Sequence, residues 1–167
     1  MAVRRRTRSR RGGRDQGAAA VEMALVMPIL FLLLMGIINY GLWFNDSLSL
    51  REGVRESARQ AVVGTLATGC TGTGMAAVAC GARAQIGATG RSYAMVWAPN
   101  GWIKGQEVVV CGMVKSMNFT GFVPLPAGGL IESKTSMSIE SVTPGPTDPI
   151  LSYADILPTG DWSWCKA

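Results

Sequence analysis

One carboxylate, Glu22, stands at the start of a long apolar stretch in a chain of 167 residues. Placing an acidic residue at the centre of a membrane costs roughly 2.5–3.5 kcal/mol, so a buried Glu22 would need an amine or another cation beside it. The simpler interpretation is that Glu22 marks the membrane edge, where the carboxylate stays ionised and hydrated. The residue types alone leave both interpretations open.

Four cysteines, all beyond the apolar stretch, could do covalent chemistry: Cys70, Cys80, Cys111 and Cys165. An even number of cysteines in an exported domain predicts two disulfides, with three possible pairings. We expect Cys70 to pair with its sequence neighbour Cys80, and Cys111 to pair with Cys165 and attach the C-terminal tail to a sheet. Buried free thiols are the alternative. A metal site is disfavoured, because the chain has no histidine and no C-x-x-C spacing.

Catalytic groupings find no support in the sequence. Without histidine, the chain cannot form a Ser–His or Cys–His pair or the zinc-protease motif. The glycine-rich segment 69–74 lacks the lysine that phosphate-binding loops carry. We therefore expect neither enzymatic activity nor a cofactor.

Residues Met23 to Asn45 are 23 consecutive positions without a charge, in a chain that is only 16% charged. A helix of that length covers about 34 Å, enough for a hydrocarbon core of about 30 Å. The stretch is too long for a removable signal peptide and lacks a suitable cleavage site. We expect Tyr40, Trp43 and Phe44 to lie at the outer interface. Asn39 could bond a neighbouring helix, although a place at the interface beside Tyr40 is favoured.

The positive charge is concentrated before the apolar stretch. Residues 1–17 carry seven arginines and one aspartate, a net charge of +6, whereas the whole chain has +5. Positive residues beside a membrane span remain in the cytoplasm, which predicts a cytoplasmic N-terminus and an extracytoplasmic C-terminal domain. An arginine-rich arm can also bind nucleic acid, but beside such a span we expect the membrane and no nucleic-acid partner.

The remaining pattern predicts an α+β fold. The helix should begin at Ala18, be interrupted near Asp46, become amphipathic, and stop at Gly64. Alternation and turn signals then predict a short helix and an antiparallel sheet, over residues 75–86, 92–98, 106–119 and 131–141. The expected organisation is a basic cytoplasmic leader, a transmembrane and amphipathic helix, and a small extracytoplasmic head, at residues 1–17, 18–63 and 64–167.

Several strings resemble one family. The string from Arg14 to Glu22, followed by an apolar helix, resembles the prepilin motif, in which a basic leader ends in glycine and a glutamate is the fifth mature residue. The string from Ala20 to Pro28 is similar to the TadE-like proteins of tight-adherence (Flp-type) pilus systems. The similarity is strong over residues 14–63, with further matching strings at 36–41 and 51–55. It is loose over residues 92–141, where 134–140 resemble the family's last strand, and absent for Cys70–Ile86 and the C-terminal tail.

This resemblance implies a pilin-like fold and a processing step. A prepilin peptidase would cut between Gly17 and Ala18, and Glu22 would serve assembly with other pilin or pseudopilin subunits and the pilus assembly machinery. Met23 departs from the tyrosine of the major pilins, and the chain is far longer, so the resemblance implies a minor pilin or pseudopilin. A membrane-anchored binding or envelope-structural protein unrelated to pili is the alternative.

Overall fold

A single long helix, α1, forms the first part of the fold. The computed structural model describes residues 13–65, 67, 69–70, 74–119, 121, 123–141, 152–158 and 160–167, with the side chains of 13–16 outside that description. α1 spans Gly13–Val62. The predictions on the arginines of residues 1–12 lie outside the described residues, and so does the proline-rich segment 143–149, which the sequence does not allow to continue a central strand.

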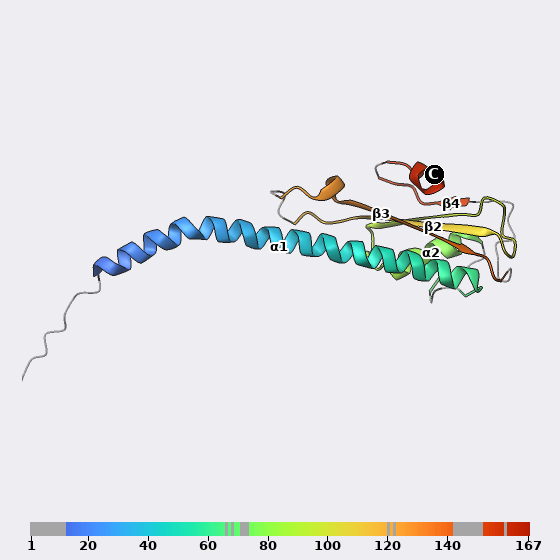
Figure 1. Ribbon diagram of the computed structural model, residues 1–167, viewed down its shortest axis with the longest axis horizontal. Helices are drawn as coiled ribbons and strands as arrows, with labels where there is room; N and C mark the ends of the chain where they lie inside the picture. The colour runs from blue at the N-terminus through green and yellow to red at the C-terminus, as the bar shows by residue number, and fades with distance from the viewer. Residues whose placement is uncertain are drawn as a thin grey trace, which may run out of the picture. The chain divides into compact units, whose positions relative to one another are not determined.

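The later elements form a small α+β head (Figure 1). In chain order they are α2 (Met75–Ile86), β1 (Ser92–Trp97), β2 (Glu107–Lys115), η1 (Pro126–Gly129), β3 (Leu130–Ser138), β4 (Ser152–Ala154) and α3 (Ser163–Lys166). The strands make one antiparallel sheet in the order β3-β2-β1-β4. The expected α+β, pilin-like arrangement is confirmed, and α2 has the predicted bounds.

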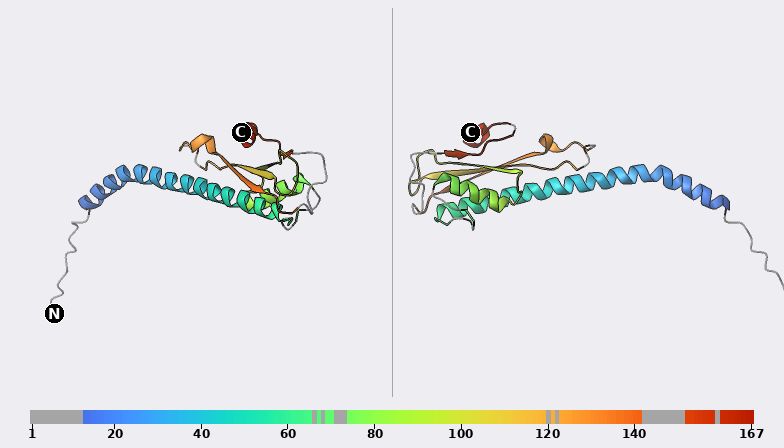
Figure 2. Two further views of the ribbon diagram at one scale, coloured as in Figure 1. Left: turned by 45° about the vertical axis from the view of Figure 1, so that its right-hand side comes forward. Right: turned by 180° about the vertical axis from the view of Figure 1, so that it is seen from behind.

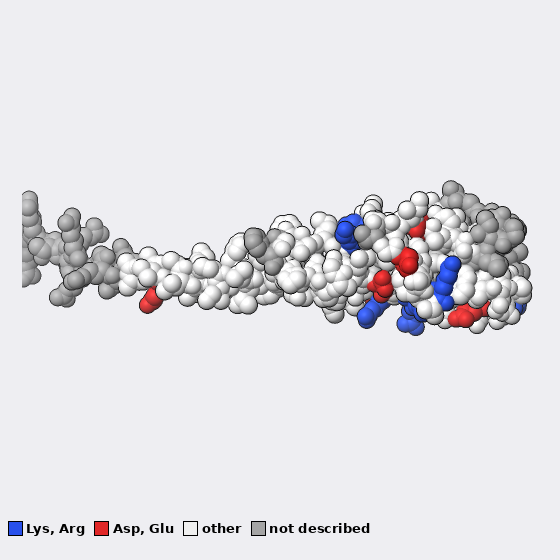
Figure 3. All heavy atoms as spheres, turned by 90° about the horizontal axis from the view of Figure 1, so that it is seen from above, with Lys and Arg blue, Asp and Glu red and all other residues white. Residues whose placement is uncertain are grey.

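The chain divides into two units, Met1–Ile38 and Asn39–Ala167. In the first unit, the described part of α1 from Gly17 to Ile38 is apolar and exposed, and one stretch of this helix is long and apolar enough to cross a membrane. Glu22 is the single charged residue between Gly17 and Asn45. Figure 3 accordingly shows an almost uncharged helix surface, whereas charges of both signs are interspersed on the head.

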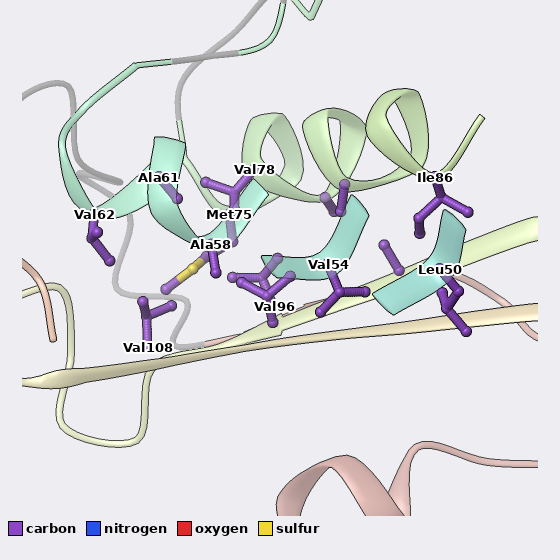
Figure 4. Packing of buried hydrophobic residues seen from close by; sticks show 14 of the residues in the cluster. Leu50, Val54, Ala58, Ala61, Val62, Met75, Val78, Ile86, Val96 and Val108 are labelled. Atoms are coloured by element: carbon purple, nitrogen blue, oxygen red, sulfur yellow. The ribbon is translucent and has the colours of Figure 1, made fainter. Parts of the chain in front are cut away.

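The core of the second unit lies between one face of the sheet and two helices. Figure 4 shows Leu50, Val54 and Ala58 pointing from α1 toward Val96 and Val108 on the strands, with α2 beside them. This is the amphipathic face that the helical spacing predicts. α1 ends after Val62 because Gly64 adopts a left-handed conformation (φ 80°), as expected from the glycine stop.

The other face of the sheet is covered by the C-terminal tail. Met95, Val109 and Cys111 contact Cys165 of α3 there, with three tryptophans packed around them: Trp97, Trp162 and Trp164. Figure 2 shows α3 and the long helix on opposite sides of the sheet. Because successive strand residues face opposite sides, β2 is buried on both faces, and its run Val108–Val114 is continuously apolar apart from Gly112.

Two of the expected boundaries in the second unit are wrong. α1 continues through Asp46 without interruption, and the Asp46 carboxylate accepts a hydrogen bond from Arg91 (3.1 Å) instead of capping a helix. β2 ends at Lys115 and not at Phe119. There, Asn118 Oδ1 accepts the Gly121 N–H (2.9 Å), so the backbone enters a turn instead of extending the strand ladder.

Candidate functional site

The predicted cleavage site lies on α1. Gly17 and Ala18 are exposed, and Glu22 is exposed one helical turn after Ala18. The expectation that the helix begins only at Ala18 is wrong, because α1 starts at Gly13. Adding residues to an existing helix forms one hydrogen bond per residue without a new nucleus, and no proline interrupts residues 13–17. The Gly17–Ala18 bond is therefore helical.

The apolar segment that follows is not packed against other parts of the described chain. Leu34 is 50% exposed and Ile37 is 71% exposed, and the most apolar stretch is wholly unburied in the structure. The 22 residues from Gly17 to Ile38 extend about 33 Å as a helix. A helix that is apolar all round is stable only inside a membrane or among other apolar helices.

Asn39 ends the exposed segment, but not in the way expected. Its side chain is fully buried, and its Oδ1 accepts the backbone N–H of Phe119 at 3.1 Å. The neighbouring Tyr40 donates its hydroxyl to the Pro124 carbonyl at 3.3 Å. The connection between β2 and β3 therefore lies along α1 and forms hydrogen bonds with the side chains of both residues. Asn39 does not sit at the open interface that the sequence favoured.

The expected aromatic belt divides between two environments. Trp43 packs against the edge of the helix–sheet core, and its indole nitrogen is buried. Tyr40 and Phe44 stay 45% and 58% exposed. Two of the three aromatic residues therefore remain available to a membrane interface or to another subunit.

Ion pairs hold the head together at places that the sequence did not indicate. Arg91, which precedes β1, pairs with Asp46 of α1 at 3.1 Å. Arg83 of α2 donates to the carboxylate of Asp155, just after β4, and this hydrogen bond raises the pKa of the Arg83 guanidinium. The Asp155 carboxylate also accepts the N–H of Ala94 on β1 at 2.8 Å. Both pairs join residues more than 40 positions apart, for which a single sequence carries no signal.

Both disulfides have the pairing that we expected. Cys70 is joined to Cys80 with a Cα–Cα distance of 5.8 Å, and Cys111 to Cys165 with a distance of 6.0 Å. The first closes the loop that enters α2, and the second fastens α3 to the middle of β2. Disulfides of this kind are typical of domains exported from the cytoplasm.

The described residues hold no cluster of three or more metal-binding side chains, and the sequence contains no histidine. Glu22 has no cationic partner within the described chain and is separated by 24 residues from the next acidic residue, Asp46. Any ion pair of Glu22 would therefore need a cation from outside the described residues.

Comparison with known proteins gives one match. The family model described as TadE-like protein matches residues 17–59, from the predicted cleavage site through most of the amphipathic half of α1. No curated protein and no solved structure matches the chain. The TadE-like family is a pilus-assembly family. Residues 17–59 of this chain are thus a TadE-like family domain, carried on a pilin-like α+β fold.

Proposed function

We propose that the chain is a minor pilin or pseudopilin of a Tad (Flp-type) pilus, inserted in the membrane by α1 and processed by a prepilin peptidase. One observation carries this proposal: the TadE-like match, residues 17–59, includes both the predicted cleavage site and the exposed apolar stretch of α1. A family domain that includes the predicted cut, followed by a helix requiring apolar surroundings, is what a processed pilin-like subunit needs.

The proposed topology places the leader inside the cell and the head outside. The net +6 charge of residues 1–17 favours retention of the N-terminus on the cytoplasmic side. The two disulfides of the head fit an oxidising compartment. In this organisation residues 1–17 are the leader, 18–63 the transmembrane and amphipathic helix, and 64–167 the extracytoplasmic head.

Cleavage would change the chemistry of the helix terminus. It would create an α-amine at Ala18 with an ordinary pKa near ~8, so the amine would be mostly charged at neutral pH. Side chains four positions apart on a helix lie about 5–6 Å from each other, which brings the Glu22 carboxylate within reach of this amine or of a neighbouring subunit's amine. Such a pair would set the axial register between packed helices more than it would add stability, because desolvation offsets much of the attraction.

The helical state of the Gly17–Ala18 bond adds a step to processing. A peptidase needs an extended backbone around the bond it cuts, so the first turns of α1 must unwind. Gly13 and Gly17 lower the free energy of that unwinding, since glycine in a helix is about 1 kcal/mol less favourable than alanine. A bulkier residue at position 17 would oppose both unwinding and access to the bond.

The test is the mass of the mature N-terminus in cells with an active pilus system. The proposal predicts a chain that begins at Ala18, and a Gly17→Leu variant that stays uncut in the membrane. Gly36→Leu is the matched control, because Gly36 lies in the same apolar helix with no atom near its Cβ position. This control should be cut normally. A native protein that keeps Met1 or Ala2 would overturn the pilin proposal and leave a membrane-anchored ectodomain.

A further inference from the structure

The connection between β2 and β3 exposes large apolar side chains at its tip. Phe119 is 69% exposed and Met117 is 54% exposed, although both follow directly on a strand that is buried on both faces. We call these two residues the apolar tip. Neither side chain contributes to a core cluster of the head.

The apolar tip is fixed beside a particular level of α1. The Phe119 N–H donates to Asn39 Oδ1 (3.1 Å), and Tyr40 donates to the Pro124 carbonyl (3.3 Å). Asn39 directly follows Ile38, the last residue of the exposed apolar segment. The tip therefore lies at the level where the exposed apolar segment of α1 ends and its packing against the head begins.

The side chains around the apolar tip are of the types with which proteins bind at a membrane interface. On α1 at the same level, Leu42 and Phe44 are exposed, and they continue the apolar surface beyond Ile38. Met117 also lines a hollow of about 330 Å³ with two cationic residues, Lys115 and Arg91, of which Arg91 is paired with Asp46. Apolar and aromatic side chains next to basic ones are the combination that binds at the boundary between acyl chains and headgroups.

We propose that the apolar tip enters the outer leaflet of the membrane, with Lys115 and Arg91 at the level of the lipid headgroups. This inference rests on the proposed membrane span of α1. The exposed apolar surface of α1 continues from Ile38 to Phe44 beside the tip, and insertion of the helix brings lipid to this surface. A lipid surface is therefore the partner that the apolar tip contacts. The contact between the apolar tip and the membrane would be a second attachment beside α1. It would restrict the tilt of the head against the membrane, which a single helix does not do.

The test is photo-crosslinking of the full chain in vesicles of phosphatidylethanolamine and phosphatidylglycerol. The variant Phe119→p-benzoylphenylalanine should give lipid adducts by mass spectrometry after illumination. Ile103→p-benzoylphenylalanine is the matched control, because Ile103 is 57% exposed but lies in the β1–β2 connection, at the opposite end of the sheet. That control should give none. Met117→p-benzoylphenylalanine is a second reporter of the tip, for use if the first variant does not fold.

A third probe separates this inference from the proposed function. Phe31→p-benzoylphenylalanine lies within the exposed apolar segment and reports insertion of α1 itself. Lipid adducts at Phe31 without adducts at the tip would overturn the inference and leave the membrane span intact. Loss of adducts at Phe31 would overturn the span. Crosslinked dimers at the tip in place of lipid adducts would assign that surface to a second copy of the chain, and would also overturn the inference.

Discussion

At the scale of single residues, two glycines determine how closely the layers of the head approach. A Cβ at Gly53 of α1 would lie 2.7 Å from the backbone nitrogen of Ile86, and one at Gly112 of β2 would lie 2.6 Å from Val54 Cγ2. Both contacts are too close for any larger residue without a shift. Gly53 belongs to the 51–55 string that resembles the TadE-like family. Its close packing against α2 explains why a glycine is required at this position.

The substitution Gly53→Ala should therefore destabilise the head. Alanine gains about 1 kcal/mol of helix propensity, but the overlap falls on the backbone of α2 and requires the helices to separate. We expect a net loss of about 1–3 kcal/mol in the free energy of unfolding, as for other overpacked cores. Denaturant unfolding of the full chain in detergent, followed by tryptophan fluorescence, measures it. Gly41→Ala, with no atom within 4 Å of its Cβ position, should lose nothing. Equal behaviour of the two variants would contradict this packing.

The carboxylate of Glu56 gives a pH-dependent prediction. Arg59 donates two hydrogen bonds to it and Gln60 one, each 2.9 Å long, and they lower the pKa of Glu56 from its ordinary 4.5 to about 2. A lowered folded-state pKa stabilises the fold above pH 4.5, and this contribution is lost as the pH falls from 4.5 toward 2. Carbon NMR titration of the side chain should show the low pKa. Arg59→Ala should raise it toward 4.5, whereas Arg55→Ala should leave it unchanged.

At the scale of elements, the sequence predicts those helix bounds that depend on neighbouring residues. The bounds of α2, Met75–Ile86, follow from its apolar spacing and from the glycine after it, and Gly64 ends α1 for the same reason. β4 escaped prediction because Ser152–Ala154 is too short to show alternation and is held in place by its partner β1. The end of β2 was misplaced because Met117 and Phe119 keep the strand alternation while the backbone turns away.

The candidate site also contains residues that a local string indicates and contacts that no local string indicates. Gly17, Ala18 and Glu22 could be predicted as site residues because the prepilin-like string is contiguous, and their roles stay predictions. The bond between Asn39 and Phe119 joins residues 80 positions apart, and nothing in the spacing of either residue indicates it. The same holds for Arg83 and Asp155, which meet only because β4 pairs with β1 beside α2. Local strings predict elements and motifs, while contacts between distant elements need the folded chain.

The C-terminal tail gives the prediction that belongs to this scale. α3 is held on the sheet by the Cys111–Cys165 disulfide, by the surrounding tryptophans, and by the Trp162 indole, which donates to the Asp155 carbonyl at 2.9 Å. In a chain-entropy estimate, this disulfide contributes about 4.2 kcal/mol and Cys70–Cys80 about 2.7 kcal/mol. Replacing Cys111 and Cys165 together by alanine should therefore lower the free energy of unfolding more than replacing the other pair.

Two measurements check the disulfides. Loss of the Cys111–Cys165 bond should also shift the tryptophan emission to the red, since Trp162 and Trp164 would become hydrated, whereas loss of Cys70–Cys80 should not. Peptide mapping without reduction should recover the two expected linkages. A peptide joining Cys70 to Cys111 or to Cys165 would show that the pairing is wrong, and free thiols in the exported protein would refute both disulfides.

At the scale of the whole molecule, the chain combines a head that folds around its own core with a helix that has none. The head buries its apolar residues from α1, α2 and the sheet, whereas the large apolar side chains from Val21 to Ile37, apart from Met35, are at least half exposed. In the proposed function, that segment lies in lipid before processing and among the helices of other subunits after it. Removal of the arginine-rich leader would allow this change, because in the proposed topology the charges of the leader hold the N-terminus at the cytoplasmic surface.

In the proposed function, this change depends on Glu22. In the proposed fibre its carboxylate is matched by the new amine of an adjacent Ala18, and an unmatched carboxylate among packed apolar helices would be costly. The substitution Glu22→Ala should therefore leave cleavage after Gly17 intact but reduce the protein in sheared pili, because the amine loses its partner. Glu52→Ala is the matched control, since Glu52 is exposed on the same helix beyond the apolar segment. Mass spectrometry of the N-terminus and immunoblots of the sheared fraction separate the two steps. Normal assembly of Glu22→Ala would show that the carboxylate does not set the register, and an uncut Glu22→Ala chain would assign Glu22 to peptidase recognition.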